Sequence, residues 1–259
     1  MNIPKIVKIL DVKKEAEKIN TILFNYPEKA SPGQFFMIWI PDVDEIPMSI
    51  SYIHNEIKGI TFKNVGNATS ALEKLKKGDQ IGIRGPYGNK FNLEFEKILF
   101  VAGGTGIATI TPAVEIFRKS NKKSFVIIGA KTKNEIFFKD RLEKSGAKIF
   151  ISTDDGSYGF KGYATDLYQD INKKEKFDSV ITCGPEIMMK TLHEQRDNLH
   201  FQASLERYIK CAIGICGQCC IGDGIRVCKE GPIFDGKTLK TIKDFGSFRR
   251  DSAGIKVRF

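Results

Sequence analysis

The feature that most constrains this chain is a group of four cysteines near its C-terminal end. Cys211, Cys216, Cys219 and Cys228 follow the spacing C-x4-C-x2-C-x8-C, with Ala212 and several glycines between them. This spacing is typical of plant-type [2Fe–2S] sites, where a tight loop directs three thiolates at the irons and a fourth arrives from further along the chain. Small residues allow backbone N–H groups to approach the sulfur atoms. The pattern predicts a redox cluster with these four cysteines as its metal ligands.

Zinc binding and disulfide bonding are the alternatives for these cysteines. Structural zinc sites usually combine two C-x2-C-like pairs, or cysteines with histidines, whereas this segment has a single such pair and no nearby histidine. Disulfides need an oxidising compartment, and MNIPKIVKIL has neither the apolar run nor the cleavage site of a signal peptide. No run approaches the roughly 18 apolar residues that span a bilayer. We therefore expect a cytoplasmic protein with no membrane contact, and a zinc-stabilised nucleotide-binding module stays as the non-enzymatic alternative.

The formal net charge of +10 invites a nucleic-acid hypothesis. A cluster with four thiolates and a bound pyrophosphate would each remove about two positive charges, which leaves about +6. The lysines are scattered along the chain, with no aromatic residues spaced between them as a stacking platform. We expect solvated helix faces and no nucleic-acid partner.

The hydrophobic pattern divides the chain into three parts. Residues 1–95 contain short apolar or alternating runs separated by Pro, Gly and Asn, which predicts an antiparallel β-barrel with one helix at 68–78. The predicted strands cover 5–10, 19–24, 33–40, 48–53, 58–65 and 79–85. Residues 96–203 alternate between strands and helices, which predicts a parallel-sheet α/β domain. Residues 204–259 form the cluster-binding segment.

Within the α/β part, each buried run is followed by a helical pattern. The predicted strands cover 96–104, 124–132, 147–156 and 177–185, and the predicted helices cover 107–120, 134–146, 164–174 and 186–197. Between the first strand and the first helix lies a glycine-rich loop with Gly103, Gly104, Thr105 and Gly106. Glycines at this position let the backbone approach a pyrophosphate at a helix N-terminus. The loop predicts a nicotinamide nucleotide site.

The second strand of this part gives no clear choice between NADH and NADPH. A carboxylate that would bind the ribose of NADH is missing at its end, and Lys131 and Lys133 stand there instead. These lysines could contact a 2′-phosphate. The sequence therefore predicts NAD(P) and leaves the choice open.

Taken together, these segments resemble the ferredoxin–NAD(P)H reductase superfamily. They are most similar to the electron-transfer subunits of the NAD-linked, two-subunit dihydroorotate dehydrogenases. The resemblance covers nearly the whole chain, and its most specific part is the cluster segment, where the last thiolate is followed by x-x-G-P-x-F. The matching segments are SPGQFFMIWIP, IPMSIS, ITFKNVGNAT, GDQIGIRGPYGNKF, VAGGTGIATITP, TDDGSYGFKGYATDL, CGPEIMMK, SLERYIKCAIGICGQCC and RVCKEGPIFDG.

The resemblance implies a flavin, FAD in the family, with FMN as the alternative. It assigns the ring and ribityl end to one strand, and the phosphates to the next strand and the turn after it; these residues are Pro47, Met48, Ser49, Ile50, Thr61, Phe62, Lys63, Gly66, Ala68 and Thr69. Two positions depart from the family pattern. Ile46 replaces a motif arginine, and Ala68 replaces a glycine. The first departure removes a phosphate partner, a role that Lys63 could take.

The resemblance also implies the function. Cys183, Gly184 and Pro185 would lie beside the nicotinamide, with Cys183 alternatively a buried structural thiol, and no side chain is predicted to be catalytic. Electrons would pass from an FMN-containing catalytic subunit that oxidises dihydroorotate, in pyrimidine biosynthesis, through the [2Fe–2S] cluster and FAD to NAD(P). The expected assembly is a heterotetramer of two chains of each kind. The alternative enzyme is an NAD(P)H reductase subunit of a hydrogenase, sulfur reductase or ferredoxin system.

Overall fold

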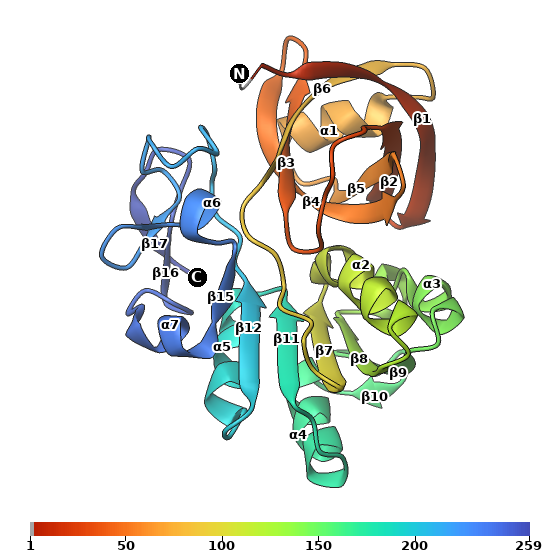
Figure 1. Ribbon diagram of the computed structural model, residues 1–259, viewed down its shortest axis with the longest axis vertical. Coiled ribbons are helices and arrows are strands. Elements are labelled where there is room, and N and C mark those ends of the chain that lie inside the picture. The colour runs from red at the N-terminus through yellow and green to blue at the C-terminus, as the bar shows by residue number, and fades with distance from the viewer. Residues whose placement is uncertain (1–2) are drawn as a thin grey trace.

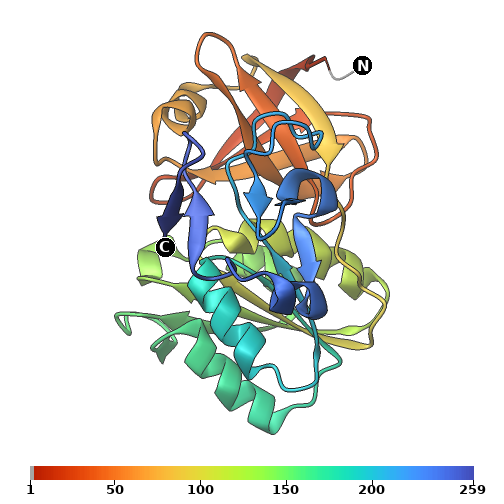
Figure 2. The same cartoon turned by 90° about the vertical axis from the view of Figure 1, so that its left-hand side faces the viewer.

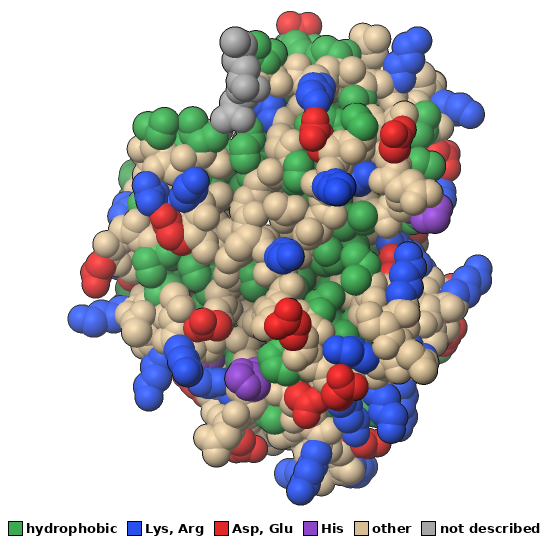
Figure 3. Space-filling view, in the orientation of Figure 1, with side chains coloured by type: hydrophobic (Ala, Val, Ile, Leu, Met, Phe, Trp, Pro, Cys, Tyr) green, Lys and Arg blue, Asp and Glu red, His purple; other side chains and the backbone are tan. Residues whose placement is uncertain are grey.

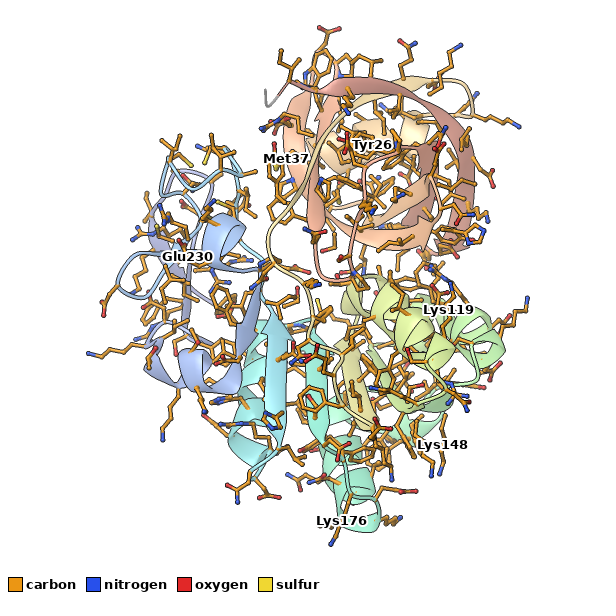
Figure 4. The ribbon with its side chains drawn as sticks, viewed as in Figure 1. Tyr26, Met37, Lys119, Lys148, Lys176 and Glu230 are labelled. Carbon is orange, nitrogen blue, oxygen red and sulfur yellow. The ribbon has the colours of Figure 1, made fainter. Side chains whose placement is uncertain are left out.

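An antiparallel barrel forms the N-terminal part of the protein. In the computed structural model, which describes residues 3–259, the barrel closes in the strand order β1-β2-β5-β4-β3-β6. Side chains that alternate along each strand fill its interior, and Ile22, Phe36, Ile50 and Ile60 are completely buried there. Tyr26 lies inside the barrel in Figure 4. The strands are β1 (Lys5–Ala16), β2 (Ile19–Asn25), β3 (Phe35–Ile40), β4 (Asp44–His54), β5 (Ile57–Lys63) and β6 (Gln80–Tyr87).

Helix α1 (Asn67–Lys74) follows β5 and packs on the barrel through Leu72. Its N-terminus is closed by Thr69, whose hydroxyl accepts hydrogen bonds from the backbone N–H groups of Val65 (2.9 Å) and Gly66 (3.0 Å). The predicted phosphate-binding residues therefore lie in β5, in α1 and in the connection between them.

A seven-stranded sheet in the order β10-β9-β8-β7-β11-β12-β15 forms the second part. All its pairs are parallel except β12 with β15. The first five strands in chain order are β7 (Lys97–Gly103), β8 (Lys123–Ala130), β9 (Lys148–Thr153), β10 (Phe160–Lys161) and β11 (Ser179–Cys183). Figure 1 shows this sheet below the barrel.

Helices cover both faces of the sheet, which explains why the central strands β7 and β11 are buried along almost their whole length. Ile98 and Phe100 face α2 (Gly106–Lys119), whereas Leu99 and Val101 face the opposite layer. That layer contains α4 (Ala164–Lys174) and α5 (Glu186–Gln195). Alternate side chains of β7 thus face opposite layers. The helix that covers one of these faces, α2, lies between the sheet and the barrel (Figure 1).

The helix predicted over residues 134–146 is interrupted, and this part of the prediction was wrong. A short 3₁₀ turn (Lys133–Glu135) precedes α3 (Lys139–Lys144), and Phe138 between them has φ of 61°. A left-handed backbone is unusual for so bulky a residue. Here it allows the adjacent rings of Phe137 and Phe138 to be buried together, with their centroids 4.9 Å apart.

The C-terminal segment is built into the sheet. β12 (His200–Ser204) pairs with β11, and β15 (Ile233–Asp235) pairs antiparallel with β12. The remaining elements are β13 (Cys220–Ile221), β14 (Ile225–Arg226), α6 (Val227–Glu230), α7 (Gly236–Thr241), β16 (Phe248–Arg250) and β17 (Lys256–Arg258). Figure 2 shows this segment across the junction of barrel and sheet.

Two observations concern the charge on one face of the molecule and the character of its helices. Lysine and arginine side chains are spread over the face seen in Figure 3 rather than gathered in one stripe. Among residues 3–259, no helix combines the length and the apolar character needed to cross a bilayer.

A buried ion pair joins the C-terminal segment to the sheet. Glu186, the first residue of α5, receives two hydrogen bonds from the guanidinium of Arg207, which follows β12; the pair between Nη2 and Oε1 is 2.9 Å long. The side chains are only 1% and 4% exposed. Glu186 Oε1 also accepts the backbone N–H of Gly246 at 2.8 Å. Because both side chains are shielded from water, each charge is stabilised mainly by its partner.

Arg207→Met should lower the free energy of unfolding by about 3–5 kcal/mol, because Glu186 would be left buried without its counter-ion. Lys139→Met removes half of the exposed pair with Glu143 (2.9 Å) and should cost less than about 1 kcal/mol. Denaturant unfolding of the two variants beside wild type measures both values. Equal effects would show that the buried pair is no more important than a surface pair.

Candidate functional site

A cavity of about 340 Å³ opens where the barrel, the sheet and the C-terminal segment meet. Its size lies within the range of ligand pockets, about 300–1,000 Å³. Each of the three parts contributes to its wall; the lining residues are Phe35, Pro47, Met48, Ser49, Thr61, Phe62, Lys63, Val65, Thr69, Thr105, Ala108, Thr109, Ser204, Leu205, Glu206, Arg207, Ile209 and Pro232.

Eight of the predicted cofactor-binding residues line this cavity. They come from β4, β5, the first turn of α1 and the loop before α2; they are Pro47, Met48, Ser49, Thr61, Phe62, Lys63, Thr69 and Thr105. The geometry thus brings the predicted flavin and nicotinamide segments to one place. Half of the lining residues are apolar and half are polar or charged, so the wall offers both apolar surface and hydrogen-bonding groups to a ligand.

The other predicted residues lie beside or behind the wall. Ile50 is buried in the barrel core, and Ala68 packs against that core. Gly66 has an extended backbone and no atom within 4 Å of the place where a Cβ would stand, so the space at the start of α1 is open. Gly103, Gly104, Gly106, Gly184 and Pro185 belong to the two loops at the carboxyl ends of β7 and β11.

The glycines of the first loop serve different purposes. A Cβ at Gly106 would lie 2.2 Å from the carbonyl oxygen of Cys183, and one at Gly103 would lie 2.7 Å from Cδ of Pro185. Gly104 has φ of +53° and no neighbour within 4 Å. Two of the glycines are therefore needed for packing against the β11–α5 loop, and the third faces open space where a ligand could approach.

Cys183 lies at the end of β11 and is completely buried. Burial, reinforced by the charge of Glu206, raises the pKa of its thiol to about 12, although hydrogen bonds to Thr109 and Ser204 oppose the shift. Both of these partners line the cavity. Cys183 is thus a neutral thiol one layer behind the cavity wall.

Lys63 is a cation in the wall of the cavity. Its ammonium group lies 2.7 Å from Oε1 of Glu135, and this hydrogen bond lowers the pKa of the Glu135 carboxyl. Ile46, which stands where the family has arginine, packs against the barrel core and is not part of the cavity lining. Lys63, unlike Ile46, therefore lies in the cavity wall.

The cluster-binding loop brings the four predicted ligands close together. Backbone N–H groups of Cys216, Ile215 and Ile213 surround the sulfur of Cys211; they outweigh burial and lower the pKa of that thiol to about 6. Cys219 Sγ accepts the backbone N–H of Cys228 at 3.4 Å. Ala212, with φ of 61°, and the glycines of the loop make these turns possible.

The sulfur atoms are grouped in two pairs. Cys216 donates to Cys211, whereas burial and the neighbouring Cys219 sulfur raise the pKa of Cys228 to about 12. In the described part of the chain, no three His, Cys, Asp or Glu side chains surround one point closely enough to hold a single metal ion. Cys220 lies apart in β13, with its thiol 3.8 Å from the carbonyl of Gly224.

A second and larger cavity of about 1210 Å³ lies between the barrel and the α2–α3 layer. Its wall is strongly charged, with Lys13, Lys119, Lys144 and Arg118 among the lining residues. Of the residues that the sequence linked to a cofactor, Lys133, a candidate contact of a 2′-phosphate, lines this cavity, whereas the flavin residues and the Gly-rich loop do not. We take the smaller cavity as the functional one because the Gly-rich loop, the barrel motif and the cluster segment converge there.

Several residues of the functional cavity escaped the sequence-based prediction. Ser204 ends β12, whose polar sequence HFQAS gave no strand signal, and Glu206, Arg207 and Ile209 follow it. Thr109 faces the cavity from the first turn of α2. The segment SLERYI was assigned to the cluster site alone, so its second role required the fold.

Family models match two parts of the chain. Residues 100–194 match the oxidoreductase NAD-binding domain, and residues 206–240 match the iron–sulfur cluster binding domain of dihydroorotate dehydrogenase B. The second match contains all four predicted cluster ligands.

Solved structures show the same architecture. A chain from the structure of an NADH-dependent reduced ferredoxin–NADP oxidoreductase superposes with a TM-score of 0.82 and 28% identity, covering 92% of this chain and 89% of the other. The ferredoxin reductase of a carbazole 1,9a-dioxygenase gives a TM-score of 0.67 at 17% identity, covering 76% and 68%. The fold and site define an iron–sulfur flavoprotein reductase of the ferredoxin-reductase type.

Curated relatives narrow this class. A probable dihydroorotate dehydrogenase B (NAD⁺) electron transfer subunit from Methanocaldococcus jannaschii is 45% identical and covers 100% of both chains. The protein of the same name from Pyrococcus furiosus is 39% identical over 96% of each chain. The chain belongs to the family of dihydroorotate dehydrogenase B electron transfer subunits.

Gly106→Ala should lower the free energy of unfolding by about 3 kcal/mol, since the new methyl group would overlap the backbone of β11 and force α2 outward. Gly66→Ala, at an extended backbone with open space, should cost less than about 1 kcal/mol. Chemical denaturation of both variants tests the difference. An undisturbed Gly106→Ala protein would mean that the loop is not closely packed against Cys183.

Proposed function

We propose that this chain carries electrons from a dihydroorotate-oxidising partner to NAD(P), in the order cluster, FAD, nicotinamide. The proposed partner is an FMN-containing catalytic subunit, two copies of which assemble with two copies of this chain. Membership of the family supports the reaction. The observation that carries the proposal is the convergence of flavin, nicotinamide and cluster segments around one cavity.

The cavity suits a flavin ring that faces a nicotinamide. Pro47, Met48 and Ser49 would bound the ring, with Ile50 behind them in the barrel, and Lys63 would neutralise a phosphate as a charge-assisted partner. The open space at Gly66 would let the same phosphates approach the first backbone N–H groups of α1, from Asn67 on. The nicotinamide nucleotide would lie on the loop Gly103–Gly106 and against Cys183–Pro185. A bound flavin supplies the conversion between two-electron and one-electron transfer.

Cys211 and Cys216 would hold one iron, and Cys219 and Cys228 the other. The pairing of the sulfur atoms supports this assignment, because a [2Fe–2S] cluster needs two thiolates at each iron. The N–H groups around Cys211 would stabilise its thiolate charge. We propose three functional divisions, with the flavin barrel at 1–95, the nucleotide domain at 96–203 and the cluster segment at 204–259.

A reductase subunit that serves another redox partner is the second candidate. The likeness to the chain from the NADH-dependent reduced ferredoxin–NADP oxidoreductase, at 28% identity, favours it over the remaining alternatives. The two candidates share every cofactor and differ only in the partner. Copurification from native cells, followed by assay of the associated subunit, separates them.

Cys→Ser substitution at 211, 216, 219 or 228 should remove or shift the visible absorbance of the cluster and the EPR signal of its reduced form. The reason is that each change deletes one of four thiolate ligands. Cys220→Ser is the matched control and should leave both signals unchanged, because its thiol lies apart in β13. Anaerobically purified protein should contain two irons and two sulfides per chain; stoichiometric zinc in place of iron would refute the assignment.

Ile213 and Ile215 mark the proposed docking surface, because they lie in the cluster-binding loop and are 38% and 79% exposed. Ile215→Asp should weaken binding of the catalytic subunit at least tenfold without loss of flavin or cluster absorbance. Ile187→Asp, at an exposed site on α5, is the control and should bind normally. The partner's Kd is measured by calorimetry, and equal affinities of the two variants would place the docking surface elsewhere.

The same preparations test the division of labour. The purified chain alone should pass electrons from NADH or NADPH to an artificial acceptor, since flavin and cluster suffice for that reaction. Dihydroorotate oxidation should require the catalytic subunit. Rapid dihydroorotate turnover by the single chain would contradict the proposed function.

A further inference from the structure

Arg226 is a cation of the cluster-binding segment to which the proposed function assigns no role. It ends β14, directly before α6, and stands two residues before Cys228. Across the β13–β14 pair it lies opposite Cys220, the residue that follows Cys219. Arg226 is therefore a neighbour of the second pair of predicted cluster ligands, both along the chain and across the two strands.

The guanidinium of Arg226 reaches the other half of the cysteine loop. Its Nη1 donates to the carbonyl oxygen of Gly214 at 2.8 Å. Gly214 lies between Cys211 and Cys216 and has φ of +81°, a left-handed conformation that favours glycine. The hydrogen bond thus fastens the turn between the first two predicted ligands to the strand that precedes the fourth.

Glu230 holds the guanidinium in this position. Its carboxylate accepts from Nε of Arg226 at 3.2 Å and from the second terminal nitrogen, Nη2. The same carboxylate accepts the backbone N–H of Arg226 at 2.7 Å. Glu230, labelled in Figure 4, is the last residue of α6. Because the two side chains are 41% and 37% exposed, the ion pair adds little to stability, and its main effect is to orient the guanidinium toward Gly214.

The peptide unit between Gly214 and Ile215 connects Arg226 to a cysteine sulfur. The carbonyl oxygen of this unit accepts from Arg226, and its N–H, on Ile215, is one of the three backbone donors at the sulfur of Cys211. In a trans peptide such as this one, the C=O and N–H bonds point in opposite directions. A cation at the oxygen also polarises the unit, which strengthens the N–H as a donor. Arg226 therefore acts on a predicted ligand that it does not touch.

This arrangement has a consequence for a bound cluster. A [2Fe–2S] cluster gains one negative charge when it is reduced, and hydrogen bonds to its sulfur atoms are among the features that set its potential. A donor that stabilises negative charge on sulfur favours the reduced form. A stronger N–H at Cys211 should therefore raise the reduction potential.

We propose that Arg226 is a positioning residue that raises the reduction potential of the cluster by holding and polarising the Gly214–Ile215 peptide against Cys211. This inference rests on the proposed function, because it needs the cluster on the four assigned cysteines. It adds that the readiness of the cluster to accept an electron is set by a side chain that is not a ligand.

Lys229 separates this proposal from a simple attraction through space. It directly follows Cys228, is exposed, and its ammonium makes no hydrogen bond or ion pair within residues 3–259. Lys229→Met therefore removes a positive charge near the cysteines without changing a contact of the loop. It is the matched control for Arg226→Met.

Arg226→Met in the chain loaded with flavin and cluster tests the proposal. The midpoint potential of the cluster is measured by EPR-monitored redox titration with chemical mediators, without partner or nucleotide. At a fixed potential the ratio of reduced to oxidised cluster should fall about tenfold, a downward shift of about 59 mV for a one-electron couple. In Lys229→Met the ratio should change less than about threefold.

Two further measurements complete the test. The coupling of exchangeable amide protons to the reduced cluster, measured by ENDOR in H₂O and D₂O, should weaken in Arg226→Met and stay unchanged in Lys229→Met. Arg226→Lys keeps the charge but replaces the planar fork with a single flexible ammonium. Its potential should lie between those of Arg226→Met and wild type. Flavin absorbance confirms that each variant is folded.

Three results would overturn the inference. These are a wild-type potential in Arg226→Met, equal shifts in Arg226→Met and Lys229→Met, and a wild-type potential in Arg226→Lys. The last of them decides the question if Arg226→Met does not retain its cluster. If loaded wild type gave no EPR signal of a two-iron cluster, the cluster assignment itself would fail, whereas a normal cluster with a potential independent of Arg226 would remove this inference alone.

Discussion

The buried pair between Glu186 and Arg207 is the interaction on which the arrangement of the site depends. Glu186 begins α5 directly after the loop Cys183–Pro185, and Arg207 follows the strand that forms one wall of the cavity. The same carboxylate also holds the backbone of Gly246. Two charges removed from water tolerate few alternative geometries. One contact therefore fixes the nucleotide loop, the cavity wall and the C-terminal segment relative to one another.

Much of the fold follows from local patterns in the sequence. Alternation at 19–24 and 58–65 predicted barrel strands, and continuous apolar runs such as ILFVAG predicted strands covered on both faces; both predictions are confirmed. Residues 134–146 were wrongly predicted as one helix, because burial of two adjacent phenylalanine rings outweighed helix propensity. β12 was missed because its polar residues are stabilised by pairing with β11 and β15, which the local sequence does not encode.

The residues of the site also fall into two groups, those that a local sequence pattern reveals and those that only the fold brings to the cavity. The cysteine spacing and the glycine loop are local signals, so their residues could be named before the fold was known. Thr109, Ser204 and Glu206 reach the cavity only because α2, β12 and the barrel meet there. Glu206 lies in the segment SLERYI, which the sequence pattern linked only to the cluster cysteines. The roles assigned to individual cofactor-binding residues stay predictions, whereas their convergence is a property of the fold.

The pairing of β15 with β12 has a consequence for how fast electrons can move. Because the segment that carries Cys228 continues directly into a strand of the main sheet, the cluster-binding loop is not a tethered module that swings between partners. The pairing of β15 with β12 therefore sets the separation between the cysteine sulfurs and the cavity in the folded chain. Transfer inside this subunit is then governed by a fixed tunnelling distance, and solvent viscosity should slow encounter with the partner but leave the internal step unchanged.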